Sequence, residues 1–213
     1  MITDERFVAY INSLDAGNPA YLDELEAYAI QTQVPIIRKE MQSFMRTMLL
    51  MNKPKRILEV GTAIGFSALL MSEFMPQDGH ITTIENYEKR IPIARANFQK
   101  YRKEDRITLL EGDAAEVLKT LEGPYDFIFM DAAKGQYIHY LPQIMRILTP
   151  GGVLISDNVM QDGDIIESKY AITRRDRTIH RRMREYLYTL THHEGLQTSI
   201  LTLGDGVAVS VRK

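Results

Sequence analysis

The first fifty residues place apolar side chains three or four positions apart, which predicts helices over residues 4–51. Pro35 lies inside this stretch and either breaks a helix or begins a new one. We therefore expect residues 1–53 to form an N-terminal helical extension that serves as an interface, a lid or core packing. The positions that carry the spacing are Ile30, Val34, Ile37, Met41, Phe44, Met45, Met48 and Leu49.

From Arg56 onwards, short apolar runs alternate with longer segments of helical pattern. This alternation predicts an α/β core over residues 54–213, in which helices cover both faces of a mainly parallel sheet. The predicted strands are 57–60, 81–84, 107–110, 127–130 and 153–155. The predicted helices are 67–74, 87–101, 114–121 and 136–148.

The last two apolar segments follow a different pattern. Residues 197–203 and 207–211 flank the turn Gly204-Asp205-Gly206, which is a strong signal for a hairpin. The sheet should therefore finish with an antiparallel pair at one edge. This ending separates the fold from a plain dinucleotide-binding sheet, whose strands are usually all parallel.

Composition and charge narrow the class of protein. The chain has 213 residues, of which 45% are hydrophobic and 25% are charged, as is typical of a folded domain. It contains no Cys, which excludes disulfides, thiolate metal sites and Cys nucleophiles. A formal net charge of −2 gives no overall reason to expect binding to nucleic acid or membrane. No signal-peptide pattern or membrane-spanning apolar run is visible, so we expect a cytoplasmic protein.

Two glycines stand in the turn after the first predicted strand. Gly61 and Gly65 allow the backbone to approach a ligand closely, although they also suit a purely structural tight turn. Glu85 ends the next strand, where a carboxylate can accept hydrogen bonds from ribose hydroxyls. The G-x-x-x-G spacing fits a pyrophosphate poorly. The pattern therefore favours a nucleoside-containing cofactor other than NAD or FAD.

Asp113 and Ala114 follow the third predicted strand and begin a helix. The Asp113 side chain could cap this helix. It could equally face an adenine amino group, with the Ala114 backbone nearby. The two roles are compatible, and the sequence leaves both open.

Polar side chains follow the fourth and fifth predicted strands. Asp131 ends one strand, and Asp157 and Asn158 end the other. These strands should be neighbours, so the three side chains can converge at the carboxyl edge of the sheet. Two carboxylates and an amide carbonyl suit Mg²⁺ or another hard divalent cation. Lys134 lies near the start of the next helix and is either a general base or an exposed surface lysine.

Together these motifs resemble the class I S-adenosylmethionine-dependent methyltransferases, and more narrowly the cation-dependent O-methyltransferases that include the catechol and caffeoyl-CoA enzymes. The resemblance covers about residues 34–213. It implies a Rossmann-like seven-stranded sheet with an antiparallel last strand, S-adenosylmethionine and Mg²⁺ as cofactors, and a homodimer. The stretches that carry it are VPII, ILEVGTAIGFSAL, TTIE, EGDA, FIFMDAAKGQY, LTPGGVLISDNV and LGDGVAVSVRK.

The resemblance also implies roles for particular residues. Asp131, Asp157 and Asn158 match the metal ligands of the family, and Lys134 with Asp131 would be catalytic. Glu85 would hold the ribose, while Ile37 closes over the cofactor and the substrate or simply packs in the core. The residues implied to contact the cofactor are Ile37, Gly61, Ser67, Glu85, Asp113, Ala114 and Asp131.

Residues 169–184 gather basic side chains against a single acid, Asp176. Because arginine suits phosphate contacts, a basic stripe beside the predicted site is the electrostatic footprint expected for RNA. A solvated helix face or a dimer interface is the other interpretation. Tyr170, Tyr186 and Tyr188 could stack on bases or pack in the core. The basic residues are Lys169, Arg174, Arg175, Arg177, Arg181, Arg182 and Arg184.

A bacterial branch of the family methylates 5-hydroxyuridine to 5-methoxyuridine at the wobble position of tRNA. The Arg-rich segment and the absence of Trp make this sequence look most like that branch, with the tRNA anticodon loop as partner. A wobble base is unpaired and can be splayed into a pocket. Two further hypotheses are a small-molecule phenol or catechol O-methyltransferase and a non-catalytic nucleoside-binding module.

Overall fold

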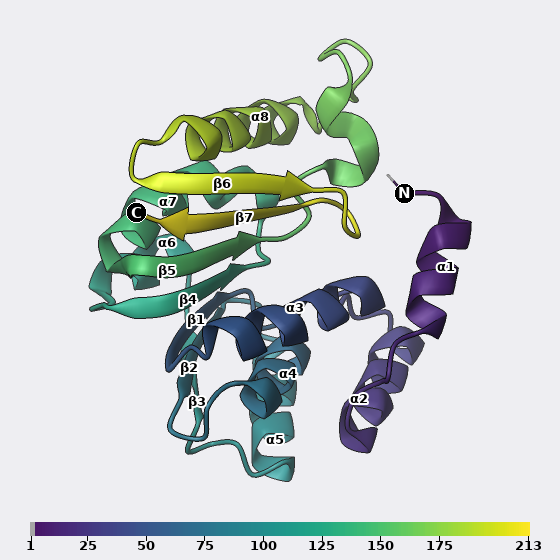
Figure 1. Cartoon of the computed structure of the whole chain (residues 1–213), viewed down its shortest axis with the longest axis vertical. Coiled ribbons are helices and arrows are strands. Elements are labelled where there is room, and N and C mark those ends of the chain that lie inside the picture. Colours follow the sequence, from purple (N-terminus) through teal and green to yellow (C-terminus); the bar gives the residue numbers. More distant parts are fainter. Residues whose placement is uncertain (1–2) are drawn as a thin grey trace.

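A seven-stranded sheet runs through the computed structural model, which describes residues 3–213 (Figure 1). The strand order is β3-β2-β1-β4-β5-β7-β6, and β7 runs antiparallel to both of its neighbours. This arrangement confirms the predicted fold, a mainly parallel Rossmann-like sheet with an antiparallel C-terminal hairpin. The strands are β1 (Arg56–Val60), β2 (His80–Glu85), β3 (Ile107–Glu111), β4 (Tyr125–Met130), β5 (Leu148–Ser156), β6 (Leu196–Leu201) and β7 (Val207–Arg212).

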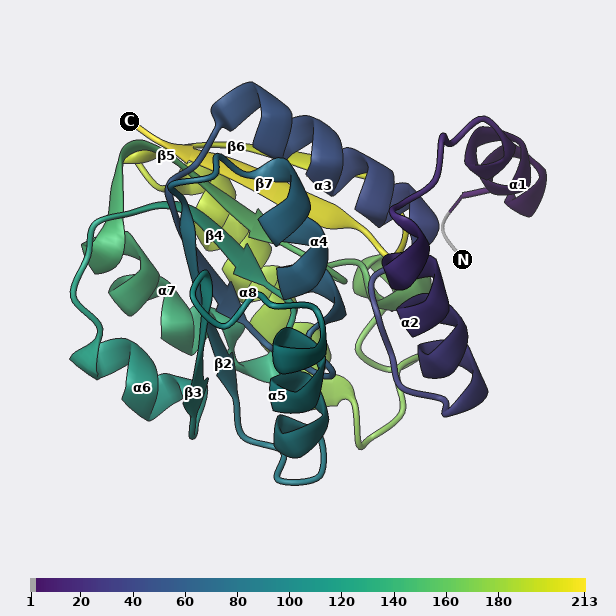
Figure 2. The same ribbon diagram turned by 90° about the horizontal axis from the view of Figure 1, so that it is seen from below.

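Helices cover both faces of the sheet (Figure 2). The second to fifth helices share one apolar cluster with the sheet, and the sixth to eighth share the other. None of the described helices is long and apolar enough to cross a membrane. The helices are α1 (Glu5–Ser13), α2 (Ala20–Gln31), α3 (Lys39–Asn52), α4 (Phe66–Phe74), α5 (Ile91–Lys100), α6 (Ala114–Thr120), α7 (Tyr137–Ile147) and α8 (Arg177–His192), with short 3-10 turns η1 (Lys134–Gln136) and η2 (Gln161–Ile166).

The central strands are mostly apolar because both faces are covered. Along β1, Ile57 packs in the cluster of α3 and α4, whereas its neighbour Leu58 packs in the cluster of α7. On β4, Phe127 likewise packs in the first of these clusters and its neighbour Ile128 in the second. Successive side chains of a strand point to opposite faces, so a strand buried on both sides shows no polar alternation.

The N-terminal region forms three helices, and Pro35 lies in the connection between α2 and α3. Helices α2 and α3 contribute to the same apolar cluster as the sheet, through residues such as Leu22 and Met45. Helix α1 buries none of its residues and stands apart at the edge of the molecule (Figure 1). The segment before Lys39 passes over the carboxyl edge of the sheet, where it forms part of the cavity described next.

Candidate active site

A cavity of about 520 Å³ opens at the carboxyl ends of β1, β2, β4 and β5. Its volume falls in the range of small-molecule binding sites, and this edge is where parallel α/β sheets bind ligands. The structure brings most of the predicted site residues together around it: Ile37, Gly61, Ser67, Glu85, Ala114, Asp131, Asp157 and Asn158. Asp113 and Lys134 lie beside the cavity and are absent from its wall.

The turn after β1 requires glycine at its first position. Gly61 has φ of +106°, and a Cβ there would lie 2.0 Å from the backbone oxygen of Asp131. The Gly61 N–H donates to Ile84 O at 3.0 Å, which ties the turn to β2. The ends of β1, β2 and β4 therefore approach one another closely. Backbone atoms, with no side chains between them, form the floor of the cavity here.

The Glu85 carboxylate is held in place by backbone donors. Its Oε2 accepts the Ala63 N–H at 2.8 Å, and its Oε1 accepts the N–H groups of Asn86 and Tyr87. Three donors leave further acceptor positions on the two oxygens. The carboxylate can therefore bind hydroxyl groups of a ligand without moving.

Asp113 caps α6, because its carboxylate accepts the Ala115 N–H at 2.8 Å. Its neighbours Gly112 and Ala114 line the cavity, whereas the Asp113 side chain is exposed. The capping role left open by the sequence is therefore present. A contact between the adenine and Asp113 stays a prediction.

Glu59 was not predicted as a site residue, yet it lies fully buried beneath the cavity. The hydroxyl groups of Ser67 and Thr83 both donate to its carboxylate. Burial raises the pKa of Glu59 to about 7, against these two hydrogen bonds, which lower it. The predicted cofactor residue Ser67 is thus fixed from below by an acid that titrates near neutral pH.

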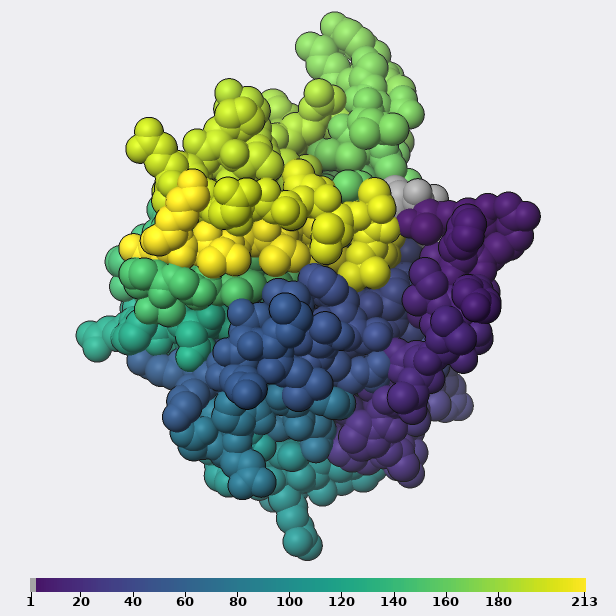
Figure 3. Space-filling model, in the orientation of Figure 1, coloured from purple at the N-terminus to yellow at the C-terminus, as the bar shows by residue number. Residues whose placement is uncertain are grey.

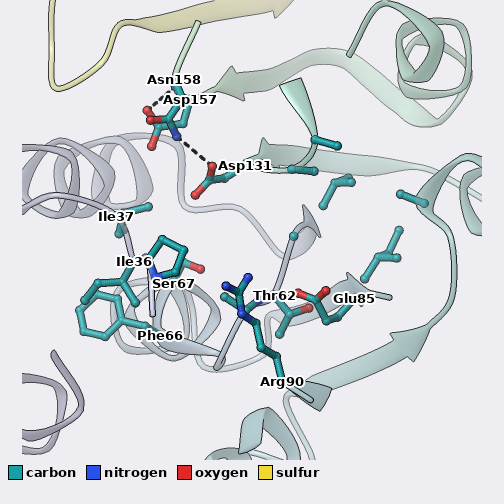
Figure 4. A pocket seen from close by; sticks show the side chains of 18 of the residues that line it. Ile36, Ile37, Thr62, Phe66, Ser67, Glu85, Arg90, Asp131, Asp157 and Asn158 are labelled. Atoms are coloured by element: carbon teal, nitrogen blue, oxygen red, sulfur yellow. Dashed lines mark hydrogen bonds between the residues drawn. The ribbon is translucent and has the colours of Figure 1, made fainter. Parts of the chain in front are cut away.

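Asp131, Asp157 and Asn158 converge at one end of the cavity, opposite Glu85 (Figure 4). The Asn158 amide donates to Asp131 Oδ1 at 2.9 Å, and the Asn158 backbone N–H donates to Asp157 Oδ1 at 2.7 Å. Asn158 adopts a left-handed φ of +59°, which asparagine tolerates better than most residues. This conformation turns its amide towards Asp131.

Asp157 is buried, and the half-buried Asp131 lies close to it. Burial raises the pKa of Asp131, and burial together with the charge of Asp131 raises the pKa of Asp157. Two neighbouring carboxylates that are largely removed from water are costly unless a cation compensates them. One oxygen of each carboxylate and the Asn158 carbonyl accept no protein hydrogen bond within residues 3–213. This set of hard oxygen donors fits a divalent cation.

No cluster of three or more His, Cys, Asp and Glu side chains suited to a metal ion is present in the part of the chain that the structure describes. The three predicted metal ligands include only two acids, Asp131 and Asp157. The third ligand is the side-chain amide of Asn158. The predicted metal ligands therefore lie together, but their role stays a prediction.

Lys134 begins η1 and donates from Nζ to Asp205 Oδ2 at 3.0 Å. Asp205 lies in the turn between β6 and β7, is 3% exposed, and lines the cavity. The sequence identified this residue only as part of a hairpin turn. The structure makes it a third acid at this end of the cavity, buried like Asp157.

Tyr137 lies behind the two strand ends that carry the acids. Its hydroxyl accepts the Ala132 N–H and lies 3.2 Å from both Met130 O and Asp157 O. The side chain is fully buried, so the hydroxyl fastens the ends of β4 and β5 to each other. These contacts link the two strand ends without any ligand, which favours a preformed site.

The basic segment 169–184 spans the loop before α8 and the first half of that helix. No residue of this described segment lines the cavity; it meets the site at Gly135, whose carbonyl accepts a hydrogen bond from Arg182 at 3.1 Å. Tyr186 is buried and its hydroxyl contacts Ser156, so it packs in the core. Tyr170 and Tyr188 are exposed.

Comparison with known proteins decides the family. The model of a family described as O-methyltransferase matches residues 12–213. The chain belongs to the O-methyltransferase family. This membership confirms the predicted class of enzyme, while the tRNA-modifying branch within it stays a prediction.

Individual relatives agree with this family. A catechol O-methyltransferase of Mycobacterium tuberculosis is 31% identical over 212 residues, which are 95% of this O-methyltransferase and 93% of the relative. A crystal structure from Staphylococcus aureus has a TM-score of 0.90 and 30% identity, and covers 99% of this chain and 100% of its own. The SAH-bound Podospora anserina methyltransferase PaMTH1 has a TM-score of 0.88 and 31% identity, covering 98% and 94%.

Several residues in the wall of the cavity were not predicted from the sequence. Arg38 lies on the segment before α3 and pairs with Asp162 at 3.4 Å, while Arg90 stacks over the Tyr87 ring. Isolated arginines before a helix carry no sequence signal that separates them from surface charges. Only the fold brings Arg38 and Arg90 to the wall of the cavity, with Arg90 beside Glu85 (Figure 4).

Proposed function

We propose that this O-methyltransferase transfers a methyl group from S-adenosylmethionine to a hydroxyl oxygen with the help of a divalent cation, Mg²⁺ in the cell. One observation carries the proposal: a single cavity holds the Glu85 carboxylate at one end and Asp131, Asp157 and Asn158 at the other (Figure 4). A ribose suits the first end and a hard cation the second. The SAH-bound Podospora anserina relative supports the same donor.

The cofactor would lie along the glycine turn. Glu85 would accept hydrogen bonds from the ribose, and the wall formed by Gly112 and Ala114 would face the adenine. Gly61 exposes backbone close to the methionine part, and Ser67 is fixed there by Glu59. Ile37 is buried in the wall of the cavity, in the segment that covers it.

The cation would be held by Asp131, Asp157 and Asn158. When bound, a divalent cation supplies positive charge that favours the ionised form of an acceptor hydroxyl. The three side chains are fixed before any ligand binds, through the Asn158 hydrogen bonds and the Tyr137 hydroxyl. The site therefore needs little rearrangement during the reaction.

We assign proton removal from the acceptor hydroxyl to Lys134 once its ammonium has given up a proton to solvent, with water as the alternative base. The acceptor oxygen then forms a bond to the methyl carbon while the bond from carbon to sulfur breaks, which leaves a neutral thioether. Lys134 follows Asp131 by three residues and lies at the rim of the cavity beside Asp205. The contribution of the protein is mainly positioning and electrostatics.

For the acceptor, we propose 5-hydroxyuridine at the wobble position of tRNA. The support is the basic segment, in which Arg174, Arg175 and Arg181 are exposed. The chain before α8 projects from the surface (Figure 3, light green). Arg174 and Arg175 form no ion pair with the described residues, so both are available for phosphates. Near its C-terminal end, this segment contacts Gly135 through Arg182. Gly135 is next to Lys134, so the segment reaches the rim of the site.

A small phenol or catechol is the second candidate acceptor, because the Mycobacterium tuberculosis relative is named a catechol O-methyltransferase. Both acceptors would use the same cation end of the cavity. A non-catalytic nucleoside-binding module is the third candidate. It would bind S-adenosylmethionine through Glu85 and transfer no methyl group.

The test is transfer of labelled methyl from S-adenosylmethionine to tRNA that carries 5-hydroxyuridine, beside catechol, each with and without EDTA. We expect EDTA-sensitive transfer to the tRNA. Transfer to catechol alone would refute the RNA acceptor, and transfer that EDTA does not affect would refute the cation. Cofactor binding without transfer to any acceptor would favour the binding module.

We also propose that the protein forms a homodimer. Helix α1 exposes apolar side chains, among them Phe7, Tyr10 and Ile11, and buries none of its own residues. Contiguous exposed apolar side chains usually mark an interaction surface. Sedimentation equilibrium should give twice the chain mass, and Phe7→Asp with Ile11→Asp should shift it to the monomer; a monomeric unmutated protein would refute the dimer.

A further inference from the structure

Asp205 is a buried carboxylate whose two oxygens serve different segments of the site. Its Oδ2 accepts from Lys134 Nζ at 3.0 Å, and its Oδ1 accepts the backbone N–H of Asp162. Lys134 belongs to the segment after Asp131, and Asp162 belongs to the segment after Asn158. Asp205 thus joins the two segments that carry the candidate cation ligands, from a third part of the chain.

Lys134 lies near both candidate ligands. It follows Asp131 by three residues, and its partner Asp205 lines the same cavity as Asp157. Within residues 3–213, however, the acid within 4.0 Å of Lys134 Nζ is Asp205. An ammonium and a divalent cation compete for the same carboxylate oxygens, so the position of Lys134 decides whether those oxygens are free.

We propose that Asp205 is a positioning residue that holds the Lys134 ammonium away from Asp131 and Asp157, and so keeps both carboxylates open to a divalent cation. The inference rests on the proposed function, because it concerns the cation which that function requires. A buried carboxylate is strongly destabilising without a partner charge, so Asp205 retains Lys134 firmly. The lysine stays at the rim of the cavity, near the acceptor.

The backbone of the turn gives a way to separate this role from simple support. Met160 N–H donates to Asp205 O at 2.9 Å, and Val159 N–H donates to Gly206 O at 2.9 Å. Neither bond involves the Asp205 carboxylate. In Asp205→Asn the side-chain oxygen can still accept the Asp162 N–H, whereas the new amide nitrogen cannot accept from an ammonium. The substitution therefore keeps the turn and releases Lys134.

The test is a double-mutant cycle on Mn²⁺ affinity, measured from the paramagnetic resonance signal of free Mn²⁺. The proteins are the unmutated enzyme, Asp205→Asn, Lys134→Met and the double variant. We expect Asp205→Asn to weaken Mn²⁺ binding ~10-fold or more, as is common for residues that orient metal ligands. Lys134→Met alone should change the affinity less than about twofold, because Asp205 already holds the lysine aside. In the Asp205→Asn background, it should restore most of the loss.

A role of Asp205 through its negative charge alone predicts a different result. If Asp205 acts only by its negative charge, Lys134→Met changes Mn²⁺ affinity by the same factor in both backgrounds. That additive result would overturn the inference, as would an unchanged affinity in Asp205→Asn. Asp164→Asn is the matched control, because it removes one exposed acid of η2 that has no contact with Lys134. A loss in Asp164→Asn as large as in Asp205→Asn would also overturn it.

Binding of S-adenosylhomocysteine to each variant, measured by calorimetry, shows that the cavity is intact. If the unmutated protein binds S-adenosylhomocysteine but no Mn²⁺, the cation of the proposed function is refuted and the inference with it. If the unmutated protein binds Mn²⁺ but the effects of Asp205→Asn and Lys134→Met on Mn²⁺ affinity are additive, the proposed function stands and the role of Asp205 is refuted.

Discussion

The substitution Glu59→Gln tests the electrostatics beneath the cavity. Glu59 is fully buried, and its carboxylate accepts hydrogen bonds from Ser67 and Thr83. Glutamine has nearly the shape of the protonated acid and keeps one acceptor and one donor group. The variant therefore imitates the neutral form of Glu59 at every pH.

The size of the effect follows from the pKa of Glu59, which burial raises from 4.5 to about 7. Each pKa unit corresponds to about 1.4 kcal/mol, so ionised Glu59 lowers the free energy of unfolding by roughly 3 kcal/mol. The folded chain holds this proton more tightly than the unfolded chain does. The contribution is therefore fully present below about pH 4.5, is lost as pH rises to about 7, and is flat above.

The assay is urea unfolding of Glu59→Gln and of the unmutated protein at pH 5 and pH 8, with EDTA present. We expect the difference in free energy of unfolding to shift in favour of the variant by about 2–3 kcal/mol between the two pH values. Other titrating groups cancel because they are common to both proteins. A difference that is the same at pH 5 and pH 8 would show that Glu59 ionises normally, which refutes the reasoning.

Three further predictions concern the site and its surroundings. Asp157→Ala should abolish methyl transfer while S-adenosylmethionine affinity by calorimetry changes less than about threefold, because Glu85 is untouched. Gly61→Ala should lower the free energy of unfolding by ~3 kcal/mol or more in urea, since its Cβ would lie 2.0 Å from a backbone oxygen. Arg174→Ala with Arg175→Ala should reduce the slope of log tRNA affinity against log salt by about 1.4 to 1.8, and an unchanged slope would place these side chains off the RNA.

The fold could be predicted from the sequence because its strongest signals are local. Continuous apolar strands between helical segments already indicate a sheet buried on both faces, and the Gly204-Asp205-Gly206 turn indicates the final hairpin. Helix limits were less accurate. The helix expected over 87–101 begins only at Ile91, whereas the one expected over 136–148 is α7, directly preceded by the unpredicted turn η1.

The candidate site was predicted in part, where residues follow directly after a strand. Asp131, Asp157 and Asn158 could be placed together because parallel strands end at one edge. Glu59 and Asp205 could not be found in this way. The role of Glu59 depends on its hydrogen bonds with Ser67 and Thr83, which only the fold brings to it. At Asp205, the preference of turns for aspartate already explains the residue, so the sequence gives no sign of a further role.

We propose that the cofactor and the cation bind side by side in one cavity, with Glu85 and Asp157 at its two ends. The most direct measurement is the NMR linewidth of S-adenosylmethionine carrying ¹³C in its transferable methyl group, bound to the protein and titrated with Mn²⁺. We expect strong paramagnetic broadening of the methyl signal in the unmutated protein and a sharp signal in Asp157→Ala at equal cofactor occupancy. A sharp methyl signal in the unmutated protein at saturating Mn²⁺ would contradict it.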